Sequence, residues 1–113
     1  MAIQLFNLNH YIKDTLPTSD IIFVRDCLVH LSFKNIFEAI ENIKKSSSKY
    51  LLTTTFTDRD ENIDIITGDW RPLNLEIKPF LFPAPEKIII ENCTEGEGKY
   101  KDKSMGLWSI KKL

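Results

Sequence analysis

Glycine is scarce in this chain, and its scarcity excludes a common kind of site. The 113 residues contain four glycines, and the first of them is Gly68. Phosphates and dinucleotides are ordinarily held by a glycine-rich turn between an early strand and the next helix, so a complete nucleotide-binding half is absent from the sequence. The run Glu95-Gly96-Glu97-Gly98-Lys99 is no substitute, because its carboxylates repel an anion and it lies in an expected hairpin turn.

An excess of charge of either sign is also missing. Fifteen Lys and Arg residues are balanced by sixteen Asp and Glu, for a formal net charge of -1, which gives no indication of binding to nucleic acid or to an anionic membrane. No apolar run approaches the roughly 20 residues that cross a bilayer, and the N-terminus lacks the pattern of a secretion signal. We therefore expect one globular domain over residues 1–113, located in the cytoplasm.

Cysteine and histidine are too few for a framework of disulfides or a structural metal site. The two cysteines, Cys27 and Cys93, fall in different expected elements, so we expect reduced thiols. A structural zinc site needs four ligands, and the chain offers only His10 and His30 besides these cysteines, without paired spacing. The sequence therefore predicts no metal.

The most informative stretch that is present runs from Asp20 to Leu31. Its apolar first half, Ile21-Ile22-Phe23-Val24, is typical of a strand buried on both faces, as in a parallel sheet covered by helices. It ends abruptly in Arg25, Asp26, Cys27 and His30. Open α/β sheets bind ligands outside the carboxyl ends of their strands, so polar groups at this point are candidates for function.

The remaining elements indicate an α/β domain. Ser32 is a suitable N-cap for an amphipathic helix whose apolar side chains recur on one face as far as Ile43. A strand before this helix and another after it, with short links, predict a right-handed parallel crossover. Beyond Phe56 we expect an ordered loop from Ile63 to Pro85 and then two strands that pair as an antiparallel hairpin. The expected strands are Ile3–Phe6, Asp20–Arg25, Tyr50–Phe56, Lys87–Glu91 and Gly106–Lys111.

Two interpretations of Asp26 and His30 follow from their spacing. If the chain turns helical after the strand, residues four apart lie on one side and can hydrogen-bond, which would make His30 a general base oriented by Asp26. In the other interpretation, Asp26 caps a turn and His30 packs against the next helix. Cys27 and His30 could also form a nucleophile pair or a pair of metal ligands, although nothing else in the sequence indicates either site.

Trp70 and Arg71 also allow two interpretations. The indole and guanidinium could stack on or clamp a ligand. They could equally pack the long loop against the domain.

Several motifs together resemble the C-terminal half of a class I S-adenosylmethionine-dependent methyltransferase, in particular a group of mostly uncharacterised bacterial methyltransferase-like proteins. The similarity extends over nearly the entire chain, and the order of the motifs makes it fairly specific. The motifs are Asp20-Ile-Ile-Phe-Val-Arg-Asp-Cys-Leu-Val-His-Leu-Ser32, Tyr50-Leu-Leu-Thr-Thr-Thr-Phe56, Thr67-Gly-Asp-Trp-Arg-Pro-Leu-Asn-Leu75, Pro79-Phe-Leu-Phe-Pro83 and Asp102-Lys-Ser-Met-Gly-Leu-Trp108.

The resemblance implies a partial Rossmann-like methyltransferase sheet. The family sheet has seven strands, six parallel and the last antiparallel, and the chain corresponds to roughly the third through the seventh. Mostly parallel strands and a C-terminal antiparallel hairpin are therefore expected. The first two strands, which carry the glycine-rich cofactor turn and the acidic residue that holds the ribose, have no counterpart.

The resemblance also implies site residues for S-adenosylmethionine and a methyl acceptor of unknown identity. Arg25 and Asp26 would lie near the methionine part of the cofactor, and Asn9 near its adenine ring, where family members often have an acidic residue. Asp26 and His30 would orient or deprotonate the acceptor. The acceptor pocket would be walled by Trp70, Arg71 and Asn74.

The expected function is thus the substrate-side portion of a methyltransferase, incomplete and inactive alone. The alternative is a non-catalytic interaction module, or relic, that retains half of the fold. Loss of two strands would leave an apolar sheet edge prone to pairing. We therefore expect a complementary chain or a homo-oligomer to cover that edge.

Overall fold

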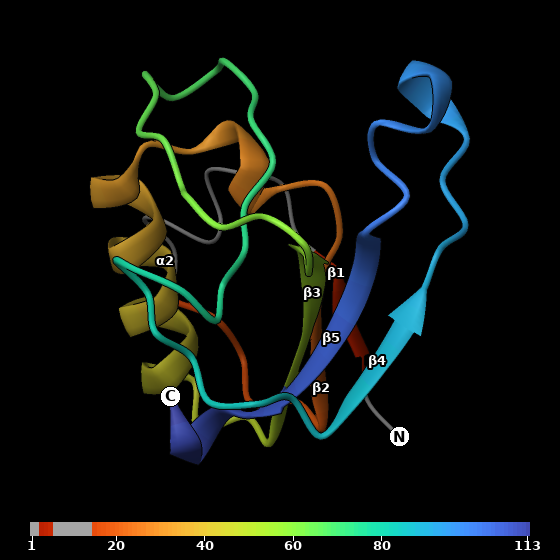
Figure 1. Cartoon of the computed structure of the whole chain (residues 1–113). Coiled ribbons are helices and arrows are strands. Elements are labelled where there is room, and N and C mark those ends of the chain that lie inside the picture. The colour runs from red at the N-terminus through yellow and green to blue at the C-terminus, as the bar shows by residue number, and fades with distance from the viewer. Residues whose placement is uncertain (1–2, 6–14) are drawn as a thin grey trace.

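The computed structural model describes the backbone of residues 3–5 and the whole of residues 15–113, and its elements are shown in Figure 1. Asn9, the expected adenine contact, lies outside the described residues. The strands are β1 (Ile3–Leu5), β2 (Ile21–Val24), β3 (Tyr50–Phe56), β4 (Lys87–Ile90) and β5 (Lys103–Ser109). The α-helix of the described residues is α2 (Phe33–Lys45), and short 3-10 turns cover Leu28–His30, Glu95–Gly98 and Ile110–Lys112.

The five strands form one mixed sheet in the order β1-β2-β3-β5-β4. β1 pairs with β2 and β2 with β3 in parallel, whereas β5 is antiparallel to both of its neighbours, β3 and β4. The domain is therefore α/β, with the expected antiparallel pairing of the last two strands. The expectation of a mostly parallel sheet is not supported, because β5 inserts between β3 and β4 and makes both of those pairings antiparallel.

Helix α2 forms as its sequence predicts. The Ser32 hydroxyl accepts the Asn35 N–H at 3.2 Å, which satisfies one of the free donors of the first turn. The apolar face, buried against the sheet, consists of Ile36, Ala39, Ile40 and Ile43. The helix ends at Lys45, and the hydroxyl of the C-cap residue, Ser46, donates to the Ile43 carbonyl at 2.6 Å.

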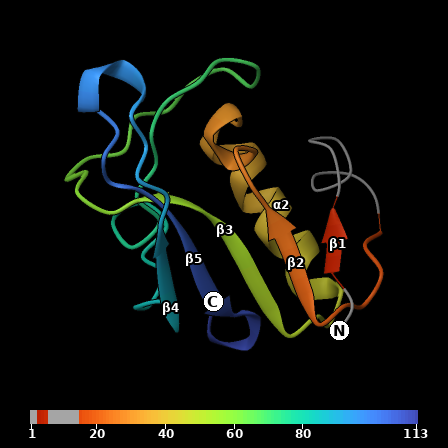
Figure 2. The ribbon, with the colours of Figure 1, turned by 90° about the vertical axis from the view of Figure 1, so that its right-hand side faces the viewer.

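α2 covers one face of the sheet (Figure 1), and no other α-helix of the described residues covers the opposite face, which is turned towards the viewer in Figure 2. The exposure of β2 follows from this arrangement. Ile22 and Val24 point to the helix side and are buried, whereas Ile21 and Phe23 are only half-buried. The expectation of a strand buried on both faces is thus met on one face alone.

The stretch between β3 and β4 is an ordered loop, as expected from its apolar residues. Leu73 and Leu75 are fully buried in the core. The ring of Phe80 packs edge-on against Phe33, with centroids 5.5 Å apart, and Phe82 packs in the same way against Trp108 at 5.2 Å. These contacts hold the second half of the loop, whereas Trp70 lies at the carboxyl end of the sheet against Phe56 and Tyr100. Within the described part of the chain, no helix has the length and apolar character to cross a membrane.

Candidate functional site at the carboxyl end of the sheet

A cavity of about 230 Å³ lies at the edge where β2 and β3 end. β5 runs in the opposite direction, so its first residue, Lys103, lies at this same edge, paired in register with the last residue of β3, Phe56. The segment that links β4 to β5 closes the cavity from the side. The lining residues are Asp26, His30, Phe56, Trp70, Cys93, Glu95, Tyr100 and Lys103.

Asp26 is held in a left-handed backbone conformation at the end of β2. Its φ is 52°, which a residue other than glycine rarely adopts, although aspartate tolerates it better than most. The Asp26 N–H donates to the Thr54 hydroxyl at 2.9 Å, which stabilises the turn. Backbone strain of this kind is concentrated at functional sites, where surrounding contacts offset its cost of about 1–2 kcal/mol.

Lys103 is the direct partner of the Asp26 carboxylate. Its Nζ lies 2.7 Å from Asp26 Oδ1, and its side chain is 19% exposed. Burial by itself would lower the pKa of Lys103, but the hydrogen bond and the charge of Asp26, with a contribution from Glu91, outweigh burial and raise this pKa. Lys103 is therefore a fixed cation on the cavity wall at neutral pH.

The Asp26–Lys103 pair belongs to a longer chain of alternating charges. Arg25 Nη2 lies 2.8 Å from Glu91 Oε1, and Glu91 Oε2 lies 3.7 Å from Lys103 Nζ. Glu91 Oε2 is buried and accepts no hydrogen bond from a described residue. The charges connect the end of β2 to the residue after β4, across the ends of the two strands between them.

His30 lies at the end of the 3-10 turn that follows β2, and its tautomer follows from its contact. Its Nδ1 is 2.9 Å from the Asp69 carbonyl, which can only accept, so Nδ1 carries the proton and Nε2 is left as the acceptor of the neutral ring. The Gly68 N–H donates to the His30 carbonyl at 2.8 Å and fixes the turn against the loop.

The structure brings Asp26 and His30 to one cavity, as their spacing predicts, but with different partners from the expected ones. The carboxylate pairs with Lys103, and the imidazole donates to a backbone carbonyl. The turn between them is a short 3-10 segment and not a full α-helical turn, so the expected direct hydrogen bond has no counterpart among the contacts that hold these two side chains. Their catalytic roles stay predictions.

Three aromatic rings form the apolar wall of the cavity. Trp70 and Tyr100 meet edge to face with centroids 5.2 Å apart, and Phe56 meets each of them at 6.1 Å. Trp70 is 41% exposed, which leaves part of the indole available to a ligand. Trp70 therefore lines the cavity, and its role as a substrate wall stays a prediction.

Arg71 and Asn74 do not line this cavity. Arg71 is buried, and its guanidinium donates to the carbonyls of Leu28, Val29 and Ile63 at 2.8–3.2 Å. Burial lowers its pKa to about 10, partly opposed by the charge of Asp64. Arg71 thus follows the packing interpretation, because it joins the loop to the turn that carries His30.

Asn74 likewise stabilises the fold, because it binds residues of the turn after β3. Its amide nitrogen donates to the Arg59 carbonyl at 2.9 Å, and its N–H donates to Asn62 Oδ1 at 2.8 Å. Arg25, the expected cofactor contact, is half-exposed and pairs with Glu91 next to the cavity.

Cys27 is an unsuitable nucleophile. It is buried, and burial raises its pKa to about 12, so the thiolate is not populated at neutral pH. Cys27 and Cys93 are both free thiols. No group of three or more His, Cys, Asp or Glu side chains within residues 15–113 is arranged to hold a metal ion.

Sequence reasoning missed Glu91, Tyr100 and Lys103. The charged segment before β5 is typical of a solvated hairpin turn, and the expected last strand begins at Gly106 and not at Lys103. The sequence signal for Lys103 was its place in the motif Asp102-Lys-Ser-Met-Gly-Leu-Trp108. The register of β5 against β3, which carries Lys103 to the cavity, is a tertiary property.

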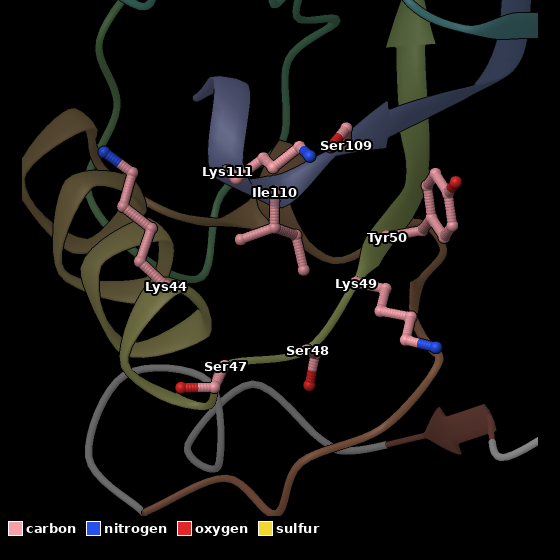
Figure 3. Close-up of a pocket in the computed structure, with 8 residues that line it drawn as sticks. All are labelled: Lys44, Ser47, Ser48, Lys49, Tyr50, Ser109, Ile110 and Lys111. Atoms are coloured by element: carbon pink, nitrogen blue, oxygen red, sulfur yellow. The ribbon is translucent and has the colours of Figure 1, made fainter.

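A larger cavity, of about 490 Å³, lies at the opposite end of the sheet and is lined by three lysines and three serines (Figure 3). The ammonium groups of Lys44 and Lys49 point to opposite sides, and they pair with Glu41 and Asp20, each at 3.6 Å. The N–H of Ser47 donates to a helix carbonyl and that of Tyr50 to the Asp20 carbonyl. Two of the three lysines are thus engaged in separate ion pairs, and the carboxyl-end cavity, with its oriented histidine and paired carboxylate, is the stronger candidate.

Comparisons of the chain with known protein families, with curated proteins and with solved structures find no match. The residues of the cavity and the motifs of the sequence are therefore the guides to function.

Proposed function

We propose that this chain is the substrate-side portion of a class I S-adenosylmethionine-dependent methyltransferase. The observation that carries the proposal is the cavity at the carboxyl edge of β2 and β3, where a histidine of defined tautomer, an ion-paired carboxylate and an aromatic wall meet. The antiparallel last strand, β5, among strands that run the other way is also the arrangement that the resemblance implies.

Each residue has a distinct role in this proposal. His30 Nε2 accepts the proton of the methyl acceptor, and the Asp69 carbonyl holds the ring in the tautomer that leaves this nitrogen available. Asp26 orients the acceptor, and Lys103 supplies the counter-charge. Trp70 and Tyr100 offer π-electron density, which attracts cations. The cofactor, when bound, supplies a methyl group on a positively charged sulfur.

The described residues fit one part of the cofactor. A cavity of about 230 Å³ is smaller than the roughly 300–1,000 Å³ that encloses a ligand of that size. In this proposal the cavity takes the acceptor and the methionine end of the cofactor. No glycine-rich turn is present before Gly68 to approach the nucleoside, so in this proposal a complementary chain supplies the adenosine-binding wall.

The alternative is a non-catalytic interaction module. The observation that favours it is the charge chain itself, in which Arg25, Glu91, Lys103 and Asp26 neutralise one another without a ligand. Such a network can serve to stabilise the ends of the strands alone.

Isothermal titration with S-adenosylmethionine and S-adenosylhomocysteine separates the two functions. The chain is titrated alone and after mixing with the product of a neighbouring gene. We expect the mixture to release or absorb heat on binding the cofactor. Asp26→Asn, which retains the shape and removes the charge, should weaken the affinity at least about tenfold. Asp60→Asn, at an exposed position in the turn after β3, is the matched control. No heat in either setting would contradict the methyltransferase proposal and favour the interaction module, whereas equal binding by both variants would contradict the role of Asp26 alone.

A further inference from the structure

We propose that a second copy of this chain pairs with β4 across a two-fold axis, extending the sheet through its open edge. β4 is the edge strand of the described sheet beyond β5. Its three consecutive isoleucines are unusually accessible, since Ile88, Ile89 and Ile90 are 39%, 55% and 62% exposed. An exposed apolar edge strand is a template for pairing with another chain.

The contacts of β4 with β5 show which of its residues point their backbone groups outward. The Glu91 N–H donates to the Lys103 carbonyl at 3.1 Å, so Glu91 and Lys103 form a hydrogen-bonded pair. Along two antiparallel strands such pairs alternate with pairs that are not hydrogen-bonded. Lys87, Ile89 and Glu91 therefore turn towards β5. Ile88 and Ile90 turn their N–H and C=O groups to the open edge.

These outward groups leave few possible registers for an antiparallel partner. If Ile88 of one copy pairs with Ile90 of the other, the Ile89 residues of the two copies face each other at the two-fold axis. Every isoleucine then faces an isoleucine. A shift of two residues in either direction brings an isoleucine opposite Glu86 or Asn92, which loses apolar contact.

The charges at the ends of the strand are compatible with the same register. Lys87 of one copy stands opposite Glu91 of the other, whose carboxylate already pairs with Arg25, so no like charges of the two strands face each other at either end. Backbone phase, apolar contact and charge thus agree on a second copy as the partner. Pairing through β4 is independent of the proposed function, because it uses none of the residues that line the cavity.

The strength of the association follows from the short length of β4. A contact of four residues a side, even with its flanking charges, is smaller than the roughly 1,200 Å² at which stable interfaces begin. We therefore expect a dimer with a Kd on the order of 10 μM, whose population changes with concentration.

Sedimentation equilibrium of the full chain tests the proposed dimer. The test uses charged substitutions of Ile89, the residue that meets its own counterpart at the two-fold axis. Ile89→Lys and Ile89→Glu each place like charges face to face, and we expect each variant to be monomeric at about 100 μM, about tenfold above the expected Kd. An equimolar mixture of the two should dimerise again, because lysine then faces glutamate. Ile66→Lys and Ile66→Glu, at an isoleucine that is 79% exposed in the loop, are matched controls and should dimerise as the unaltered chain does.

Circular dichroism verifies that the Ile89 variants are folded, as expected for a side chain with half of its surface in water. Ile89→Cys adds a measurement that does not depend on affinity, since non-bonded antiparallel positions bring Cβ atoms within disulfide range. After oxidation of this variant by dissolved oxygen, which takes up the two electrons and two protons of the thiols, mass spectrometry should find a disulfide that joins the introduced thiols of two copies. A monomeric unaltered chain at about 100 μM, a dimer that survives both charged variants, or no recovery on mixing would each overturn the inference.

Discussion

The Arg59–Asp102 ion pair should contribute measurably to stability, because it joins the turn after β3 to the segment that enters β5. Asp102 accepts from Arg59 Nε at 3.0 Å, from Arg59 Nη2 at 3.1 Å and from the Asp58 N–H at 3.1 Å. The carboxylate side chain is 4% exposed, whereas that of Arg59 is 28% exposed. Asp102→Asn retains the shape and removes the charge.

The magnitude follows from these contacts. Hydrogen bonds to a charged group contribute about 1.5–3 kcal/mol each when buried, but solvent around Arg59 and the oxygen that asparagine retains recover much of that energy. We expect Asp102→Asn to lower the free energy of unfolding by about 2 kcal/mol, and Asp102→Ala by about 3 kcal/mol. Asp60→Asn, at an exposed position, should stay within about 0.5 kcal/mol of the unaltered chain.

The effect should depend on pH in a defined direction. Burial tends to raise the pKa of Asp102, but the hydrogen bonds from Arg59 and Asp58 and the charge of Arg59 outweigh burial and lower it below the ordinary 3.8. A depressed carboxyl pKa stabilises the folded state fully above the ordinary value, and this stabilisation is lost as the pH falls through the folded value. The difference in stability between the unaltered chain and the Asp102→Asn variant should therefore shrink in acid.

Urea unfolding followed by tryptophan fluorescence, repeated between about pH 7 and about pH 3, measures both effects. A loss below about 0.5 kcal/mol at neutral pH would show that solvent offsets the pair almost completely. A loss that is constant with pH would show that the shape of the site, and not its charge, is responsible.

Three further predictions concern single positions. Gly106→Ala should destabilise the chain by about 2 kcal/mol in urea unfolding, since a Cβ there would lie 2.5 Å from the buried Trp108 ring; no loss would show that the ring can move. Leu81→Gly should stabilise it by up to about 1 kcal/mol in the same assay, because Leu81 has φ 53° and is 62% exposed, and a loss would mean that its side chain packs. In native alkylation followed by mass spectrometry, Cys93 should react at least about tenfold faster than Cys27, whose pKa burial raises to about 12; equal rates would contradict the burial of Cys27.

The local elements of this protein follow from its sequence. Helix α2 follows from the apolar period and from the Ser32 cap, and β3 follows from a run of β-branched and apolar residues, because these are interactions between near neighbours in the chain. The polar residues at the end of β2 identified one wall of the cavity for the same reason.

Which side chains meet in the cavity depends on the tertiary structure. The insertion of β5 between β3 and β4 places Lys103 beside Asp26, and the long loop places Asp69 against His30. Arg71 looked like a ligand clamp in the sequence, but the backbone carbonyls that it binds come from a turn far from it along the chain. Strand order and register depend on contacts between distant residues, and their partners are not encoded by local spacing.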